Sequence, residues 1–269
     1  MRVRVIFKLK NRGANLPFHH QFVLANFISG IIENSNEGGF SEFDFYNFSG
    51  LKGQTRVNKN GLHYYSNHVT LVLSSPNQEF LDFLLKEIFE MSEIELGELI
   101  LQPETTELEE VDEMDKEMKF ICISPLVAIQ SSSNSNHDKR LVSPESDEFS
   151  DLLYDSTMER MEDSKRFSKE QMNSFNKFQF VPDQGYLKKL KERDKKFARI
   201  YAVNKNEERY EVRGYTLPFK LHAAPAVQQF IFNCGLGNYT DKGFGMLDLA
   251  NLGPGKRTSP YAFSRTDVS

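Results

Sequence analysis

The stretch GLGNYTDKGFGM, residues 235–246, decides how the rest of the chain is interpreted. It follows a short amphipathic segment and ends in an apolar strand. Its glycines, together with Lys242, form a loop whose backbone amides can approach an anion without obstruction by side chains. The spacing matches neither the dinucleotide-binding G-x-G-x-x-G nor the Walker loop, which ends in Gly-Lys-Ser/Thr. The stretch predicts either a phosphate-contacting loop for a polymer or a tight structural turn.

The chain around this loop is long enough for one large domain or for two domains of roughly 100–130 residues each. Its net charge of −5 conceals an uneven distribution, because residues 93–117 are strongly acidic and residues 188–213 are rich in Lys and Arg. A basic face is therefore compatible with the acidic total. The N-terminal MRVRVIFKLKNRG lacks the apolar core of a signal peptide, and no apolar stretch approaches a membrane span. We expect a cytoplasmic protein without a membrane partner.

The cysteines and histidines do not form a metal-binding pattern. Cys122 and Cys234 both lie in apolar runs without a CxxC spacing, and the six histidines are scattered. We therefore expect buried free thiols, no metal and no cofactor.

The first half of the chain alternates between strand and helix patterns. Val3, Val5 and Phe7 face one side of an opening strand, and apolar residues then recur at helical spacing after Pro17. The predicted elements are a strand at 3–10, a helix at 17–32, strands at 43–48 and 62–74, a helix at 80–89 and a strand at 95–105. This β-α-β-β-α-β order is that of a ferredoxin-like unit.

The second half repeats this order loosely. Its predicted elements are a strand at 118–129, a helix opened by Ser143-Pro144, a hairpin of 197–203 and 210–221, a helix at 225–232 and a strand at 243–249. We predict an α+β fold of two tandem ferredoxin-like (RRM-like) domains, residues 1–115 and 116–252. Residues 253–269 are expected to be a disordered tail.

Two such halves that end in a glycine-rich loop resemble the CRISPR-associated endoribonucleases that process repeat RNA, within the repeat-associated RNA-binding superfamily. The resemblance spans residues 1–250 and depends on the order and spacing of its features. These are the opening strand, the Leu16-Pro17-Phe18 helix start, the Phe48-Ser49 strand, the Ser124-Pro125 strand break, the Ser143-Pro144-x-x-x-x-Phe149 helix start and GLGNYTDKGFGM.

The resemblance implies a hydrolase of antiviral defence that binds CRISPR repeat RNA and cleaves it at one site without a metal. In this family the ribose 2′-OH attacks the adjacent phosphate, which gives a 2′,3′-cyclic phosphate and a 5′-OH. That reaction needs a base, an acid and a cation near the phosphorane. It is restricted to RNA because DNA has no 2′-OH. A CRISPR effector complex is a further expected partner of the chain, which we expect to be a monomer or a homodimer.

The chain departs from the family at its catalytic residues. Members commonly carry a histidine in or just after the first helix, but residues 33–45 contain none, and Ser29 stands where some members have a tyrosine. His20, in the first turn of the first helix, has a suitable ordinary pKa for proton transfer. Lys52 could supply the cation, and Tyr46 could donate a proton only with a substantially lowered pKa. Alternatively, His20 is an ordinary helix-start histidine and the chain binds RNA without cutting it.

Two groups of residues are candidates for contact with the RNA backbone. In the loop they are Gly235, Gly237, Lys242, Gly243 and Gly245; in the basic hairpin they are Arg199, Arg209 and Arg213. Tyrosines interleave with these arginines at positions 201, 210 and 215, and could stack on bases. The alternative for the hairpin is an ordinary basic face in contact with solvent. The alternative for the loop is a purely structural turn in an unrelated two-domain protein.

Overall fold

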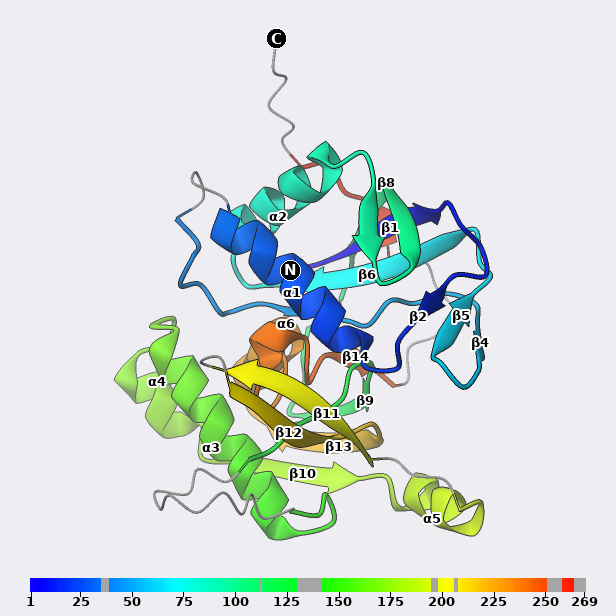
Figure 1. Ribbon diagram of the computed structural model, residues 1–269. Coiled ribbons are helices and arrows are strands. Elements are labelled where there is room, and N and C mark those ends of the chain that lie inside the picture. The colour runs from blue at the N-terminus through cyan, green and yellow to red at the C-terminus, as the bar shows by residue number, and fades with distance from the viewer. Residues whose placement is uncertain are drawn as a thin grey trace. The chain divides into compact units, whose positions relative to one another are not determined.

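The computed structural model describes residues 1–34, 39–111, 113–129, 142–194, 198–205, 208–250 and 258–263. These residues form two compact units. The first contains the described residues of Met1–Val111, Asp241–Gly243 and Lys256–Ser269, and the second contains those of Asp112–Thr240 and Phe244–Gly255. Helices and antiparallel sheets occur in both (Figure 1), so the predicted α+β class is confirmed.

The first unit is built on an antiparallel sheet with the strand order β8-β1-β6-β3. Its elements along the chain are β1 (Arg2–Leu9), α1 (His20–Asn34), β3 (Asn47–Phe48), β6 (His68–Ser74), α2 (Gln78–Glu90) and β8 (Leu99–Glu109). Numbered along the chain, the strands lie in the order fourth, first, third, second. This is the predicted ferredoxin-like arrangement.

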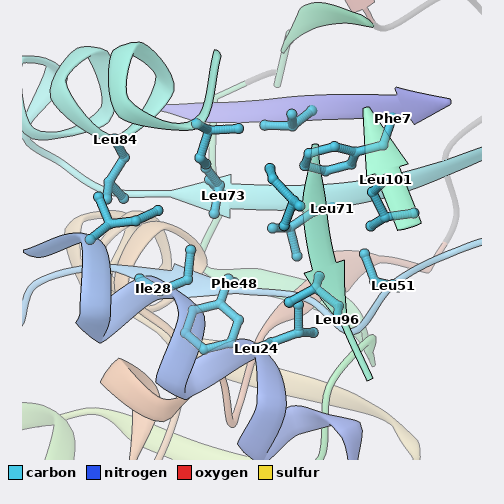
Figure 2. Close-up of a cluster of buried hydrophobic side chains, with 14 of the residues drawn as sticks. Phe7, Leu24, Ile28, Phe48, Leu51, Leu71, Leu73, Leu84, Leu96 and Leu101 are labelled. Carbon is cyan, nitrogen blue, oxygen red and sulfur yellow. The ribbon is translucent and has the colours of Figure 1, made fainter. Parts of the chain in front are cut away.

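The core of this unit follows from the alternation in β1 and the helical spacing in α1 and α2. Val3, Val5 and Phe7 are buried as predicted, and α2 buries side chains three and four residues apart. Asn77 caps α2 by accepting a hydrogen bond from Phe80 N at 3.2 Å. Figure 2 shows residues from both helices and from the sheet meeting in one apolar cluster.

Short strands extend the first unit. β2 (Asn15–Leu16), β5 (Leu62–Tyr64) and β4 (Thr55–Val57) form a small separate sheet, while β7 (Ile94–Leu96) pairs with β8. The strand predicted at 62–74 is therefore two strands, β5 and β6, because its two halves pair with different partners.

The prediction of a disordered C-terminal tail is wrong for its described part. β15 (Thr258–Pro260) pairs with the outer edge of β8, and Thr106 Oγ1 donates to Tyr261 O at 2.6 Å. Pairing with an existing strand supplies backbone hydrogen bonds that the composition of the segment does not reveal. The rest of the predicted tail lies outside the described residues.

The second unit repeats the ferredoxin-like arrangement in the sheet β10-β13-β9-β14. Its elements are β9 (Glu117–Cys122), α3 (Asp147–Asp163), β10 (Phe178–Pro182), β13 (Pro218–Ala223), α6 (Pro225–Cys234) and β14 (Leu247–Leu249). Three further elements precede β13: α4 (Lys169–Ser174), α5 (Gln184–Glu192) and the hairpin of β11 (Ala198–Lys205) with β12 (Glu208–Tyr215).

Two predicted elements of this unit are corrected. The second strand of the sheet is β10, which the sequence does not predict. Most of the predicted hairpin forms the separate two-stranded sheet β11–β12, and the end of its second strand belongs to β13. Helix α3 begins at Asp147 after Ser146, not at Pro144, because residues 143–146 form a turn in which Ser146 N donates to Ser143 O at 3.0 Å.

Cys122 and Cys234 are buried free thiols, as predicted, and burial raises the pKa of Cys122 to about 12. The described residues contain no group of three or more His, Cys, Asp or Glu side chains placed to hold a metal ion. No helix in the described ranges combines the length and apolar character needed to cross a membrane.

Candidate nucleic-acid interface

His20 begins α1 with a half-buried side chain. Its Nδ1 lies 3.3 Å from Pro17 O, which favours the tautomer with a proton on Nδ1 and a free lone pair on Nε2. Burial lowers the pKa of His20 and the neighbouring His19 lowers it further, while the contact with Pro17 opposes them. The imidazole is therefore neutral at pH 7 and able to accept a proton at Nε2.

Gly50 lies next to His20 Nε2 and has no side chain that could block it. A β-carbon placed at Gly50 would lie only 2.9 Å from His20 Nε2, so any side chain here would displace the ring or cover it. Lys52 follows two residues later. Its backbone is fixed by reciprocal 2.8 Å hydrogen bonds with Thr70. Its side chain is exposed, and its charge helps Arg2 and Arg4 to lower the pKa of Glu109. The structure thus places the segment that carries Lys52 against the first turn of α1.

A residue of the glycine-rich loop reaches the same turn. Gln21, which follows His20, is buried and donates a 2.6 Å hydrogen bond from Nε2 to Gly243 O. Gly243 has φ +78, and a β-carbon there would overlap both Gln21 and Phe48. Lys242 is half-buried beside Asp241, with 3.2 Å between Nζ and the carboxylate. Three segments far apart in sequence therefore meet within the first unit.

Tyr46 does not meet the condition set for a proton donor. It is only 5% exposed, and its ring centroid lies 5.0 Å from that of Phe80. Burial raises the pKa of Tyr46, and the carboxylates of Asp241, Asp44 and Glu33 raise it further. A raised pKa is the opposite of what proton transfer at neutral pH requires, so Tyr46 is a core residue.

The other loop glycines lie in the second unit and are buried. Gly235 has φ +83 at the end of α6, and its amide donates to Ile231 O at 2.8 Å. The amide of Gly245 donates to Pro125 O at 2.7 Å. These two amides are therefore occupied within the protein and do not form the predicted anion-binding loop.

Steric contacts give the same glycines an architectural role. Gly237 and Gly245 have φ values of +82 and +69. A β-carbon would overlap Val127 O at Gly237 and Leu236 O at Gly245. The chain needs glycine at these positions in order to fold back on itself between α6 and β14.

The predicted arginine grip is divided between the two faces of the β11–β12 hairpin. Arg213 pairs with Ile200 and Arg199 pairs with Gly214, so these two arginines lie on opposite faces of the hairpin. Arg199 is exposed and Arg213 is half-buried, while the side chain of Arg209 lies outside the described part of the structure. Arg199 and Arg213 therefore do not share one face of the hairpin.

The stacking role predicted for Tyr201 and Tyr215 is also corrected. The ring centroid of Tyr201 lies 5.5 Å from that of Phe244, and the hydroxyl of Tyr215 donates to Val142 O at 2.9 Å. Burial raises the pKa of both phenols. Tyr215 is buried in the core of the second unit, and Tyr201 is half-buried against it. The side chain of Tyr210 is outside the described residues.

Sequence reasoning missed Gln21 and Gly50. Gln21 stands in an apolar helix start and looks like an ordinary polar residue, because only the fold reveals its hydrogen bond to Gly243, more than two hundred positions away. Gly50 gave a weak signal, since a glycine directly after a strand marks a turn or a close approach.

Comparisons with known proteins agree with this fold. The family model described as "CRISPR associated protein Cas6, C-terminal" matches residues 107–249. Solved structures that resemble the chain include "CRISPR associated protein Cas6" (19% identity, 93% of this chain and 99% of the other, TM-score 0.72). Another is "An RAMP protein binding different RNA substrates", with 20% identity over 93% of this chain and 100% of the other and a TM-score of 0.76. A third is described as a "Cas6-related gene from Pyrococcus furiosus", with 17% identity over 93% of this chain and 98% of the other and a TM-score of 0.77. A search of curated proteins finds no match.

Proposed function

The chain belongs to the Cas6 family of CRISPR-associated proteins, and from this premise we propose that it binds CRISPR repeat RNA and cleaves it at one site without a metal ion. The observation that carries the proposal is the meeting of three segments at the first turn of α1. His20 Nε2 faces Gly50, Lys52 follows Gly50, and Gln21 holds Gly243. A neutral base and an ordered loop thus meet at this turn, and we assign the cation to Lys52, which follows in the same segment.

In the proposed reaction His20 takes the proton from the ribose 2′-OH. The 2′ oxygen then attacks the adjacent phosphorus, and the bond from phosphorus to the 5′ oxygen breaks. A 2′,3′-cyclic phosphate forms, and the 5′ oxygen leaves with a proton from solvent. Lys52 offsets the charge of the phosphorane, and the positive end of the α1 dipole acts in the same direction.

Labelled repeat RNA incubated in EDTA tests this reaction. We expect one cut, with a cyclic phosphate at the upstream end, and no cut when the reacting ribose is replaced by its 2′-deoxy form. The substituted RNA should still bind, because only the attacking hydroxyl is missing. Cleavage that stops in EDTA, or a cut deoxy substrate, would contradict the proposal.

A second candidate is a non-cleaving RNA-binding protein with the same fold. Two observations favour it: residues 33–45 contain no histidine, and one structural relative is described as an RAMP protein that binds different RNA substrates. A stable complex with repeat RNA that yields no product would support this candidate over the enzyme. If the chain has no affinity for any RNA, both candidates are wrong and the glycine-rich loop has only a structural role.

The direction of the His20 pKa shift predicts the pH profile. Because the imidazole must be neutral to act as base, kcat/KM should rise with pH through a pKa below 6.5 and be level near pH 7. The same shift affects the free energy of unfolding, because the folded protein favours neutral His20. This stabilisation is fully present above about pH 6.5 and is lost as the pH falls through the lower pKa of His20 in the folded state. A profile that rises only above pH 7 would contradict this assignment.

A further inference from the structure

The small sheet of the first unit carries an aromatic and basic cluster that the proposed reaction does not use. Arg56 in β4 pairs across the strands with His63 in β5, and Tyr65 lies two residues beyond His63 on the same face. The Arg56 guanidinium lies 5.2 Å from the centroid of the Tyr65 ring. The His63 ring is nearly parallel to that of Tyr65, at 20° and 6.3 Å. We call these three residues the Tyr65 cluster.

The cluster combines exposure with a fixed position. Tyr65 is 44% exposed, unlike the tyrosines packed in the hairpin of the second unit. Its amide donates to Gln54 O at 2.9 Å. His63 Nδ1 lies 2.9 Å from Gly13 O, and its Nε2 contacts the side-chain amide of Asn58. A ring that is already held in place loses little conformational entropy when a flat ligand stacks on it.

The surroundings of the cluster are basic. Residues 1–32 and 49–78, which meet in this sheet, contain no Asp or Glu. Arg12 is exposed beside Gly13, whose carbonyl contacts His63, and Lys59 is exposed in the turn between β4 and β5. The nearby carboxylate of Glu98 is engaged by the amide of Asn15 at 3.1 Å. Exposed aromatic rings among cations are typical of surfaces that hold single-stranded nucleic acid.

We propose that the Tyr65 cluster stacks on an unpaired base of the bound RNA while the surrounding cations contact its phosphates. This inference rests on the proposed function and adds a single-stranded segment to the substrate. A paired base would not serve, because its faces are covered by neighbouring bases in a duplex. The position fits an RNA strand that also reaches Lys52, because Lys52 lies three positions before Thr55, the first residue of β4. Three steps along the chain span at most about 10 Å. Figure 1 shows β4 and β5 in this small sheet beside β2.

The absence of tryptophan from the sequence provides a direct test. Tyr65→Trp creates a single fluorescent reporter in the cluster, and Tyr154→Trp creates a control reporter on α3 between Asp151 and Asp155. Each variant is titrated with a single-stranded RNA that contains the repeat, with a fully paired RNA of equal length, and with an abasic ribose-phosphate chain. Labelled RNA reports binding independently by anisotropy.

We expect the single-stranded RNA to quench the reporter at position 65 and leave that at position 154 unchanged. The paired and abasic chains should quench position 65 weakly. Tyr65→Leu should weaken binding of single-stranded RNA about tenfold, and Arg56→Gln should weaken it more than Arg166→Gln, which removes an equal charge from an exposed position in the second unit. Bound RNA that leaves position 65 unquenched, or a Tyr65→Leu variant with parental affinity, would overturn the stacking site alone. Failure of the parent chain to bind any RNA would overturn the proposed function as well.

Discussion

His20→Ala is expected to slow cleavage of repeat RNA by about 10²–10⁴-fold, the usual contribution of a positioned general base. Binding should change little, because the side chain supplies one neutral ring at a site where Lys52 and the helix dipole attract the phosphate. Single-turnover cleavage at saturating RNA, measured beside a filter-binding isotherm, separates the two effects. Added imidazole should restore part of the rate, which a purely structural role of His20 would not allow.

His19→Ala is the matched control. It removes the same chemical group from the preceding, exposed position and should leave the rate within a few-fold of the parent. Equal cleavage by the parent and His20→Ala would remove His20 from the mechanism. A large loss in His19→Ala alone would move the catalytic role by one residue, and would contradict the orientation of His20 Nε2 towards Gly50.

The fold was largely predictable because its signals are local. Alternation in residues 3–7 and the apolar spacing in 80–88 report which side of each element is buried, and the β-α-β-β-α-β order then limits the topology. The errors occurred where pairing partners decide the structure. The sequence does not indicate the strand at 178–182, because this segment is short and stands among polar residues. The sequence predicts a disordered tail at 258–260, because nothing in the composition of these residues reveals the edge of β8 that they join.

The candidate site was predictable only in part. His20, Lys52 and Gly243 were chosen for their chemistry, and the structure brings their segments together through Gln21 and Gly50. Those two contacts depend on tertiary structure, so no local pattern announces them. The stacking prediction for the tyrosines of the second-unit hairpin is wrong for the converse reason. Alternation with arginine suggests exposure, but Tyr215 is buried and Tyr201 packs against an apolar cluster. Side-chain chemistry indicates what a residue can do, and packing decides whether it is free to do it.

Glycine-to-alanine substitutions can separate architecture from RNA contact. Gly245→Ala is expected to lower the free energy of unfolding by about 3–5 kcal/mol without any RNA present. Its φ of +69 is unfavourable for alanine, and the new methyl group would also overlap Leu236 O, so the loop must shift as a whole.

Gly39→Ala is the control for this substitution, because Gly39 has a similar φ of +63 and its β-carbon would meet no atom within 4 Å. It carries the backbone penalty alone and should lower the free energy of unfolding by about 1 kcal/mol. Urea unfolding of both variants therefore isolates the steric part of the Gly245 effect. If the two variants lose equal stability and only Gly245→Ala loses affinity for RNA, the glycine acts at the RNA interface. If Gly245→Ala is far less stable before RNA is added, the loop contributes by shaping the chain, and contact with RNA then falls to Lys242 and the first turn of α1.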